Sequence, residues 1–277
     1  MEGVADEVNI FSEILATPSG MALFALLGAC WGSFAATLSD RWPKGGSIVG
    51  PRSACASCGR KLAVADLVPI LSFLVTRGRC RHCEARIPVR YPLTETACAG
   101  VAMAAALLLP GPQAVWIALF GWQLVALALL DAEHFWLPDV LTGMLAATGL
   151  AHALIMAAPV LSDALAGGVS GFLSLYAIAV VYRHVRHKAG LGGGDPKLFG
   201  AVGLWSGWQP LPVILFSSAL IGIGLAAVLT IRDRGDRQFL SRRLPFGTCL
   251  AISAWLWLLV LTRNDTITLG ILATSQH

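Results

Sequence analysis

Charged residues are scarce in this chain. Asp, Glu, Lys and Arg make up 13% of its 277 residues, whereas 56% are hydrophobic, and soluble domains carry about 25% charged residues. The mean hydropathy is +0.70. This composition excludes an ordinary soluble domain and a disordered chain, and it indicates a protein whose solvent is the lipid bilayer. A nucleic-acid partner is disfavoured, because the net charge of +4 would have to form a soluble basic surface.

The apolar residues are grouped into about eight segments, and a helix that crosses the bilayer needs about 20 residues. One segment, at 197–208, is short, so we expect it to cross only part of the membrane or to be buried among its neighbours. The pattern predicts an all-α polytopic membrane protein with about eight transmembrane helices. They are expected at residues 17–39, 93–109, 113–131, 138–159, 162–182, 197–208, 211–231 and 245–262.

Residues 1–16 contain no Lys or Arg. A secretory signal peptide needs a basic start, so we expect the first apolar segment to be a retained helix. The acidic residues before it are Glu2, Asp6, Glu7 and Glu13. We expect this acidic segment to remain outside the cytoplasm, because basic residues mark the cytoplasmic side.

The distribution of Lys and Arg predicts the orientation. With eight spans the connections alternate between the two sides, and 19 of the 20 basic residues then fall on one side, with only Arg263 on the other. Cytoplasmic loops carry the excess of Lys and Arg. This places residues 40–92 and the loops near 183–197 and 232–243 in the cytoplasm of the predicted inner-membrane protein.

Residues 40–92 form the one large polar insertion, and it contains two CxxC motifs. Cys55 and Cys58 are separated from Cys80 and Cys83 by 21 residues, which is typical of two knuckles that bind one tetrahedral Zn²⁺. Two disulfides are the alternative, but they belong to oxidising compartments. Four thiolates leave no position for a water, so the metal is expected to hold the insertion folded and not to catalyse.

Acidic residues beside membrane spans are costly and mark function. Asp131 ends the third span, where the helix dipole disfavours a negative charge. Asp139 follows Pro138 at the start of the fourth span, where an acid is ordinary helix-start chemistry, so its role stays open. Glu133 and His134 are expected to face water.

Asp195 follows a glycine cluster that begins at Gly190 and enters the short sixth segment. An N-terminal cap of a helix before Pro196 is one interpretation. The glycines favour another, in which bare backbone lies against an extended peptide. A phosphate-binding loop is disfavoured, because the full pattern is absent and the acid repels an anion.

Asp131 and Asp195 are predicted at the same membrane boundary on different helices, as a carboxylate pair requires. One carboxylate would activate a water while the other donates a proton to the scissile carbonyl. The helix start is expected to lower the pKa of Asp195, so that Asp195 begins as the base. A proton- or cation-coupled transporter is the alternative, although we find no inverted repeat.

Several motifs together resemble the type IV prepilin peptidases, which are membrane aspartyl proteases of the GxGD class. The resemblance covers nearly the whole chain and depends on the order of its pieces. They are Gly32-Ser-Phe34, the two CxxC motifs, Pro69-Ile-Leu-Ser-Phe73, Arg77-Gly-Arg-Cys80, Arg90-Tyr-Pro-Leu-Thr-Glu95, Leu130-Asp131, Leu137-Pro-Asp139, Gly192-Gly-Gly-Asp195 with Lys197, and Pro245-Phe-Gly247.

The resemblance implies that Asp131 and Asp195 are catalytic and that Gly192, Gly194, Lys197 and Asp139 support them. It implies substrates that are prepilins or type II secretion pseudopilins, cut after a Gly that ends a basic leader. It also implies N-methylation of the new terminus with S-adenosylmethionine, whose binding residues the sequence does not identify. We expect Glu133, Asp139 or Glu95 to bind the basic leader, so that reversing their charge raises KM.

Three segments are predicted from these features. Residues 1–39 comprise the acidic segment and the first transmembrane helix, and residues 40–92 form the cytoplasmic zinc-binding domain. Residues 93–277 form the transmembrane peptidase domain.

Overall fold

The structure, a computed structural model, describes residues 12–15, 17–46, 50, 52–187, 192–232 and 244–274. Glu2, Asp6 and Glu7 of the acidic segment and Gly190 of the glycine cluster lie outside these residues. So do several basic residues used to predict the orientation, namely Lys188, Arg234, Arg237, Arg242 and Arg243.

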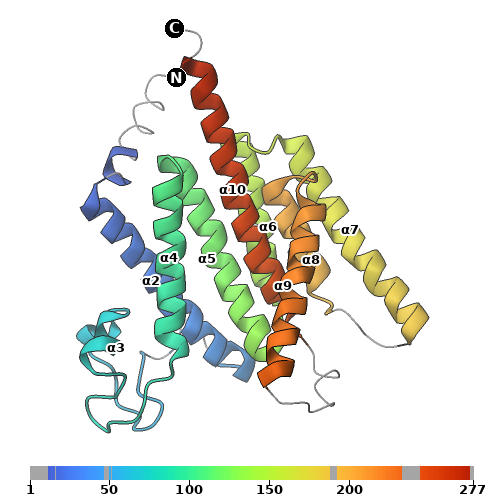
Figure 1. The fold of residues 1–277 in the computed structure, drawn as a ribbon. Helices are drawn as coiled ribbons and strands as arrows, with labels where there is room; N and C mark the ends of the chain where they lie inside the picture. Colours follow the sequence, from blue (N-terminus) through green and yellow to red (C-terminus); the bar gives the residue numbers. More distant parts are fainter. Residues whose placement is uncertain are drawn as a thin grey trace. The chain divides into compact units, whose positions relative to one another are not determined.

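The described residues form an all-α protein in which β-structure is limited to two isolated bridges. Seven of the helices are long and apolar enough to cross a membrane, which confirms the predicted fold class (Figure 1). They are α2 (Pro18–Arg41), α4 (Arg90–Leu108), α5 (Gly111–His134), α6 (Asp139–Met156), α7 (Leu161–Arg186), α9 (Leu211–Arg232) and α10 (Phe246–Thr274).

The segment predicted at 197–208 is helix α8 (Asp195–Ser206). With 12 residues it is about 18 Å long, too short to cross about 30 Å of hydrocarbon. Its large side chains are buried, with Trp205 at 0% and Phe199 at 1% exposure. The expectation of a short, buried helix is therefore confirmed, and the long apolar helices of the described chain number seven.

The chain divides into two compact units, Met1–Ala126 and Leu127–His277. In the first unit, α2 and α4 lie side by side (Figure 1). Gly28 and Gly32 permit this, since a Cβ at either position would collide with the α4 backbone at Cys98 or Thr94. Such small residues are what membrane helices use for close backbone approach.

In the second unit, α8 packs against α6 and α7. Gly167 of α7 and Gly203 of α8 face each other so closely that a Cβ on either would strike the other backbone. The indole N–H of Trp205 donates to the Leu145 carbonyl of α6 at 2.9 Å. Because α8 is held on two sides, the position of Asp195 at its first residue is fixed by packing.

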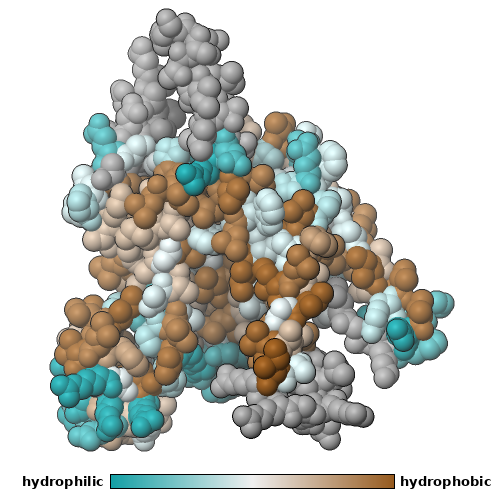
Figure 2. All heavy atoms as spheres, viewed as in Figure 1, coloured by the Kyte–Doolittle hydropathy of each residue, from teal (hydrophilic) through white to brown (hydrophobic). Residues whose placement is uncertain are grey.

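Large hydrophobic side chains are exposed along the long helices. Val169 is 61% exposed and Phe216 is 66% exposed, and Figure 2 shows hydrophobic side chains over much of the helical surface. Exposed apolar area of this extent would promote aggregation in water. It is the surface that a protein dissolved in a bilayer presents to lipid.

Candidate active site and metal centre

The four cysteines of the two CxxC motifs lie together in the first unit. Their Sγ atoms are all within 4.8 Å of one another, and those of Cys55 and Cys83 are 3.7 Å apart. Four sulfurs about 2.3 Å from a tetrahedral Zn²⁺ lie about 3.8 Å apart, whereas a disulfide requires about 2.05 Å. The cysteine geometry therefore fits zinc, as the spacing predicts, and does not fit the disulfide alternative.

The two knuckles are built alike. A bridge joins Ala54 to Lys61 across the first motif, and another joins Arg79 to Arg86 across the second. The backbone N–H of each leading cysteine donates across its turn, Cys55 to Arg60 and Cys80 to Ala85, at 2.9 Å in both. Gly59 has the left-handed φ of 69° expected of a tight turn. The two motifs therefore present their cysteines from the same kind of backbone turn.

Backbone donors favour the thiolate form of Cys55. Backbone N–H groups of Cys58 and Ser57 lower the pKa of the Cys55 thiol to about 6. The thiolate is the form that coordinates zinc. Cys30, Cys98 and Cys249, which the sequence assigns no ligand role, are free thiols outside this cluster.

Asp131 is buried near the end of α5, with 6% exposure. Its Oδ2 accepts the backbone N–H of Thr248 at 2.7 Å, and the Thr248 hydroxyl lies 3.2 Å from the same oxygen. Thr248 is in the first turn of α10, where N–H groups have no partner within the helix. The start of α10 therefore offsets the unfavourable dipole at the end of α5.

Asp195 is the first residue of α8 and has 4% exposure. Its Oδ2 accepts the backbone N–H of Gly192 at 3.0 Å. Both acids are thus held through one oxygen by a backbone donor, and they belong to the same compact unit. This confines the free rotation of each carboxylate, which is what a catalytic pair requires.

The pKa of Asp195 is raised by its surroundings. Burial, and after it the proximity of the Asp131 charge, raise the pKa of Asp195 to about 7. The prediction that the helix start lowers this pKa is wrong, because desolvation of the buried carboxyl outweighs the N–H dipoles. The raised pKa favours the protonated form of Asp195 more than in an ordinary aspartate.

The glycine loop before Asp195 contacts Leu137. A Cβ at Gly194 would lie 2.6 Å from the Cβ of Leu137, and one at Gly192 would lie 3.0 Å from Oδ2 of Asp195. A Cβ at Gly193 would have nothing within 4 Å. Leu137 also leaves no room for a side chain at Gly247. A Cβ there would be 3.0 Å from both the Leu137 Cδ1 and the Asp131 Oδ2. Bare backbone at these positions brings both acids close to one leucine.

These contacts predict that an added methyl group is harmful at Gly194 and tolerated at Gly193. Gly194→Ala is expected to lower the rate of catalysis by about 10²-fold, because displacing a reacting group by about 1 Å has that effect. Gly193→Ala should stay within about twofold of wild type. Steady-state rates of the two variants, with thermal unfolding to confirm that both fold, test this. Equal rates would contradict the packing role of Gly194.

Asp139 and Lys197 form an ion pair in the second unit. Their Oδ1 and Nζ atoms are 2.6 Å apart, and the side chains are 74% and 46% exposed, respectively. Lys197 lies two residues after Asp195 on α8, whereas Asp139 begins α6. The pair therefore ties the start of α6 to the start of α8.

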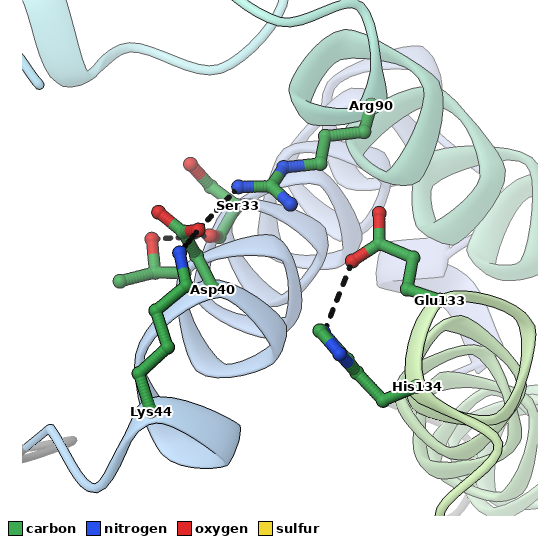
Figure 3. Close-up of polar contacts among 7 residues, drawn as sticks. Ser33, Asp40, Lys44, Arg90, Glu133 and His134 are labelled. Carbon is green, nitrogen blue, oxygen red and sulfur yellow. Dashed lines mark hydrogen bonds and ion pairs between the residues drawn. The ribbon is translucent and has the colours of Figure 1, made fainter.

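The other acids differ in their access to a substrate. Glu95 is buried, and its Oε2 accepts the backbone N–H of Ile70 at 2.7 Å. The Glu95 carboxylate therefore supports the strained backbone at Ile70, which has a φ of 62°, and does not face solvent to bind a leader. Glu133 is partly exposed beside His134, with 3.7 Å between Oε2 and Nε2 (Figure 3).

Figure 3 also shows a charge cluster in the first unit. Arg90 and Lys44 both contact Oδ1 of Asp40, each at 2.8 Å. Arg90 opens α4 and Asp40 is near the end of α2, so the cluster joins these two helices where the cysteine insertion leaves and returns.

Thr248 is a site residue that sequence reasoning missed. The available signal was its place directly after Pro245-Phe-Gly247, in a first helical turn whose N–H groups need acceptors. Its hydroxyl donates to the Ala128 carbonyl at 2.9 Å. A hydroxyl has one hydrogen, so it can donate to an ionised Asp131, or donate to Ala128 and accept from a protonated Asp131. Thr248 therefore suits both protonation states.

We expect Thr248→Val to lower kcat roughly tenfold with KM unchanged, since about 1.4 kcal/mol is the value of a hydrogen bond to a polar partner. Thr248→Ser keeps the hydroxyl and should restore most of the rate. The measurement is a comparison of kcat and KM for the three proteins. A Val variant that matches wild type would show that the hydroxyl has no part in catalysis.

Comparison with known proteins gives consistent matches. Residues 26–109 match the bacterial peptidase A24 N-terminal domain, and residues 118–227 match the type IV leader peptidase family. A prepilin leader peptidase/N-methyltransferase of Aeromonas hydrophila is 39% identical over 216 residues, which cover 77% of this chain and 73% of that protein. One from Pseudomonas putida is 38% identical over 218 residues, covering 74% and 71%. No solved structure matches.

Proposed function

Because this chain belongs to the type IV leader peptidase family, we propose that it removes the leader peptide of prepilins with Asp131 and Asp195 as its catalytic pair. Its relatives are also named N-methyltransferases, so we assign both activities to this chain. The observation that carries the catalytic assignment is geometric. Two buried carboxyls from different helices each accept a backbone N–H, and the glycines beside them, Gly194 and Gly247, both lie against Leu137. The transporter alternative receives no support from the matches.

The reaction proposed for the pair is hydrolysis by an activated water. One ionised carboxylate removes a proton from the water, which attacks the scissile carbonyl, and the protonated carboxyl donates to the carbonyl oxygen. Oδ2 of each acid is bound to a backbone N–H, of Thr248 for Asp131 and of Gly192 for Asp195. The Oδ1 atoms are therefore the oxygens assigned to the water and the substrate.

The chain is a bacterial inner-membrane protein, given its seven apolar helices and its family. We place the acids and the cysteine insertion on the cytoplasmic side, because residues 40–92 and 183–197 are joined by four spans, fall on the same side, and carry 14 of the 20 basic residues. A basic leader stays on that side while the apolar segment that follows it lies in the bilayer. Substrates would include pseudopilins of type II secretion, which carry the same kind of leader.

The chain is further assigned three segments, at 1–39, 40–92 and 93–277. Cys55, Cys58, Cys80 and Cys83 would hold a structural Zn²⁺ in the second segment, because their spacing matches tetrahedral coordination. The metal would supply folding energy and no chemistry. S-adenosylmethionine would supply the methyl group for the new N-terminus, and among the described residues no group is assigned to its binding.

The function is tested by incubating the purified protein with a prepilin in detergent or proteoliposomes. The proposal expects the prepilin to lose the mass of its leader. A prepilin in which Val replaces the last Gly of the leader should not be cut, because a larger side chain there would displace the scissile bond from the acids. Equal cleavage of both substrates would contradict leader peptidase specificity.

A further inference from the structure

Large hydrophobic side chains are exposed on the cysteine insertion, outside the long helices. They lie on the 3₁₀ turn η2 (Val64–Leu67) and the short helix α3 (Leu71–Val75), which contact each other. Contiguous apolar side chains on a surface outside the membrane spans mark an interaction site. We call this set the α3 patch. Its members and their exposed fractions are Val64 (75%), Leu67 (43%), Leu71 (57%), Leu74 (65%) and Val75 (64%).

The start of α3 is held against the membrane helix α4. The backbone N–H of Ile70, the residue before α3, donates to Oε2 of Glu95 at 2.7 Å. Glu95 is five residues into α4, which is about 7.5 Å along the helix axis from Arg90. Arg90 pairs with Asp40 of α2, and this charged pair marks the membrane boundary. The bond from Ile70 therefore places the start of α3 level with the first turns of a transmembrane helix (Figure 1).

The backbone of Ile70 is strained in this position. Its φ is 62°, a conformation that is unfavourable for a β-branched residue. Strain of this kind persists only where the surrounding structure determines it. Here the buried carboxylate of Glu95 accepts the Ile70 N–H. The position of α3 beside α4 is therefore set by the fold of the first unit.

The insertion around the α3 patch is basic. Residues 52–89 contain seven Arg or Lys and two acids, Asp66 and Glu84, a net charge of +5. A basic leader or a second copy of this insertion would be repelled by that charge. Figure 2 shows hydrophobic side chains on the part of the insertion nearest the long helices, at lower left, and hydrophilic ones at its far end. Apolar surface beside basic residues is what binds an anionic membrane surface.

We propose that the α3 patch inserts into the interfacial region of the anionic membrane leaflet at which α2 ends and α4 begins. The apolar side chains lie among the upper acyl chains, and the basic residues lie against anionic headgroups. This contact goes beyond leader cleavage, because it concerns how the cysteine insertion is oriented on the membrane. The insertion is then held by α4 on one side and by lipid on the other.

Fluorescence quenching in liposomes tests the contact directly. A fluorescent non-canonical amino acid replaces Leu74 or, as the control, Arg60, an exposed residue of the first cysteine turn. The zinc-loaded full-length protein is reconstituted with lipids that carry a nitroxide quencher near the headgroup. The label at position 74 should be quenched strongly and the label at position 60 weakly. Equal quenching of both labels, or none at position 74, would overturn the proposal.

A second experiment measures amide hydrogen exchange of residues 64–75 in liposomes of phosphatidylcholine and phosphatidylglycerol. It compares wild type with Leu74→Asp and with the matched control Ala56→Asp, an equally exposed site in the first CxxC motif. Because Leu74 is 65% exposed, its replacement leaves the folded insertion intact, which the zinc content checks. Exchange should be about tenfold faster in Leu74→Asp than in wild type and the control.

The same exchange measurement distinguishes the other occupants. Omitting phosphatidylglycerol should speed exchange in the wild-type protein, because the basic residues then lose their anionic partners. Equal exchange with and without phosphatidylglycerol would overturn the anionic contact. Protection that appears only when a prepilin is added would assign the α3 patch to the substrate, and protection that rises with the protein-to-lipid ratio would assign it to a second copy. Either result would overturn the proposal.

Discussion

Asp131→Asn and Asp195→Asn are each expected to lower prepilin cleavage by about 10³-fold or more, since general acid–base catalysis contributes about 10²–10⁴-fold. An amide cannot take the proton of the attacking water, and it cannot share a proton with the remaining carboxyl. The effects should not add, because the two acids act as one unit. Single-turnover cleavage of a saturating prepilin by the single and double variants measures this.

Asp163→Asn is the matched control, an acid in the first turn of α7. We expect its cleavage rate to stay within about twofold of wild type. If either variant of the pair retained the wild-type rate, the missing carboxyl would have no catalytic part. If the fold-reduction in the cleavage rate of the double variant equalled the product of the two single fold-reductions, the acids would act independently.

Cys58→Ser is expected to abolish zinc binding and unfold the cysteine insertion. A structural zinc site contributes about 10–16 kcal/mol to the folding of a small metal-binding domain, and residues 52–89 contain only short helices to replace it. Elemental analysis should fall from one zinc per chain to almost none. Amide hydrogen exchange should become fast in the insertion while the long helices stay protected.

Cys30→Ser is the control for this loss, because Cys30 is a free thiol outside the four-cysteine cluster. It should keep one zinc per chain and a protected insertion. A Cys58→Ser protein that retained both would show that the four thiols do not hold the insertion. The Cys58→Ser protein should lose a smaller fraction of its cleavage rate than of its bound zinc, since Asp131 and Asp195 belong to the other compact unit.

The helices were predictable because the bilayer imposes a length and a polarity on each span. The four cysteines were likewise predictable as ligands of one metal, because two CxxC motifs are the usual ligand set of a tetrahedral zinc site. The boundary of α5 was not predictable from hydropathy, because Asp131 is followed by one more polar helical turn that ends at His134. Hydropathy cannot separate that turn from a loop.

The surroundings of the acids depend on contacts between distant parts of the chain. The bond from Thr248 to Asp131 joins residues 117 apart, and the collision of Gly194 with Leu137 joins two different elements. The pKa of Asp195 was misjudged for the same reason, since its burial arises from the packing of α8 against α6 and α7. The electrostatics of a helix end do not include the free-energy cost of burying a carboxylate.

Mass spectrometry of the pilin N-terminus tests the central claim most directly. A prepilin and isotope-labelled S-adenosylmethionine are incubated with wild type, Asp131→Asn or Asp195→Asn. With wild type the pilin should begin after the leader Gly and carry one labelled methyl group, and with either variant the leader should remain intact. Release of the leader by an Asp131→Asn or Asp195→Asn protein at the wild-type rate would contradict the assignment of these two residues.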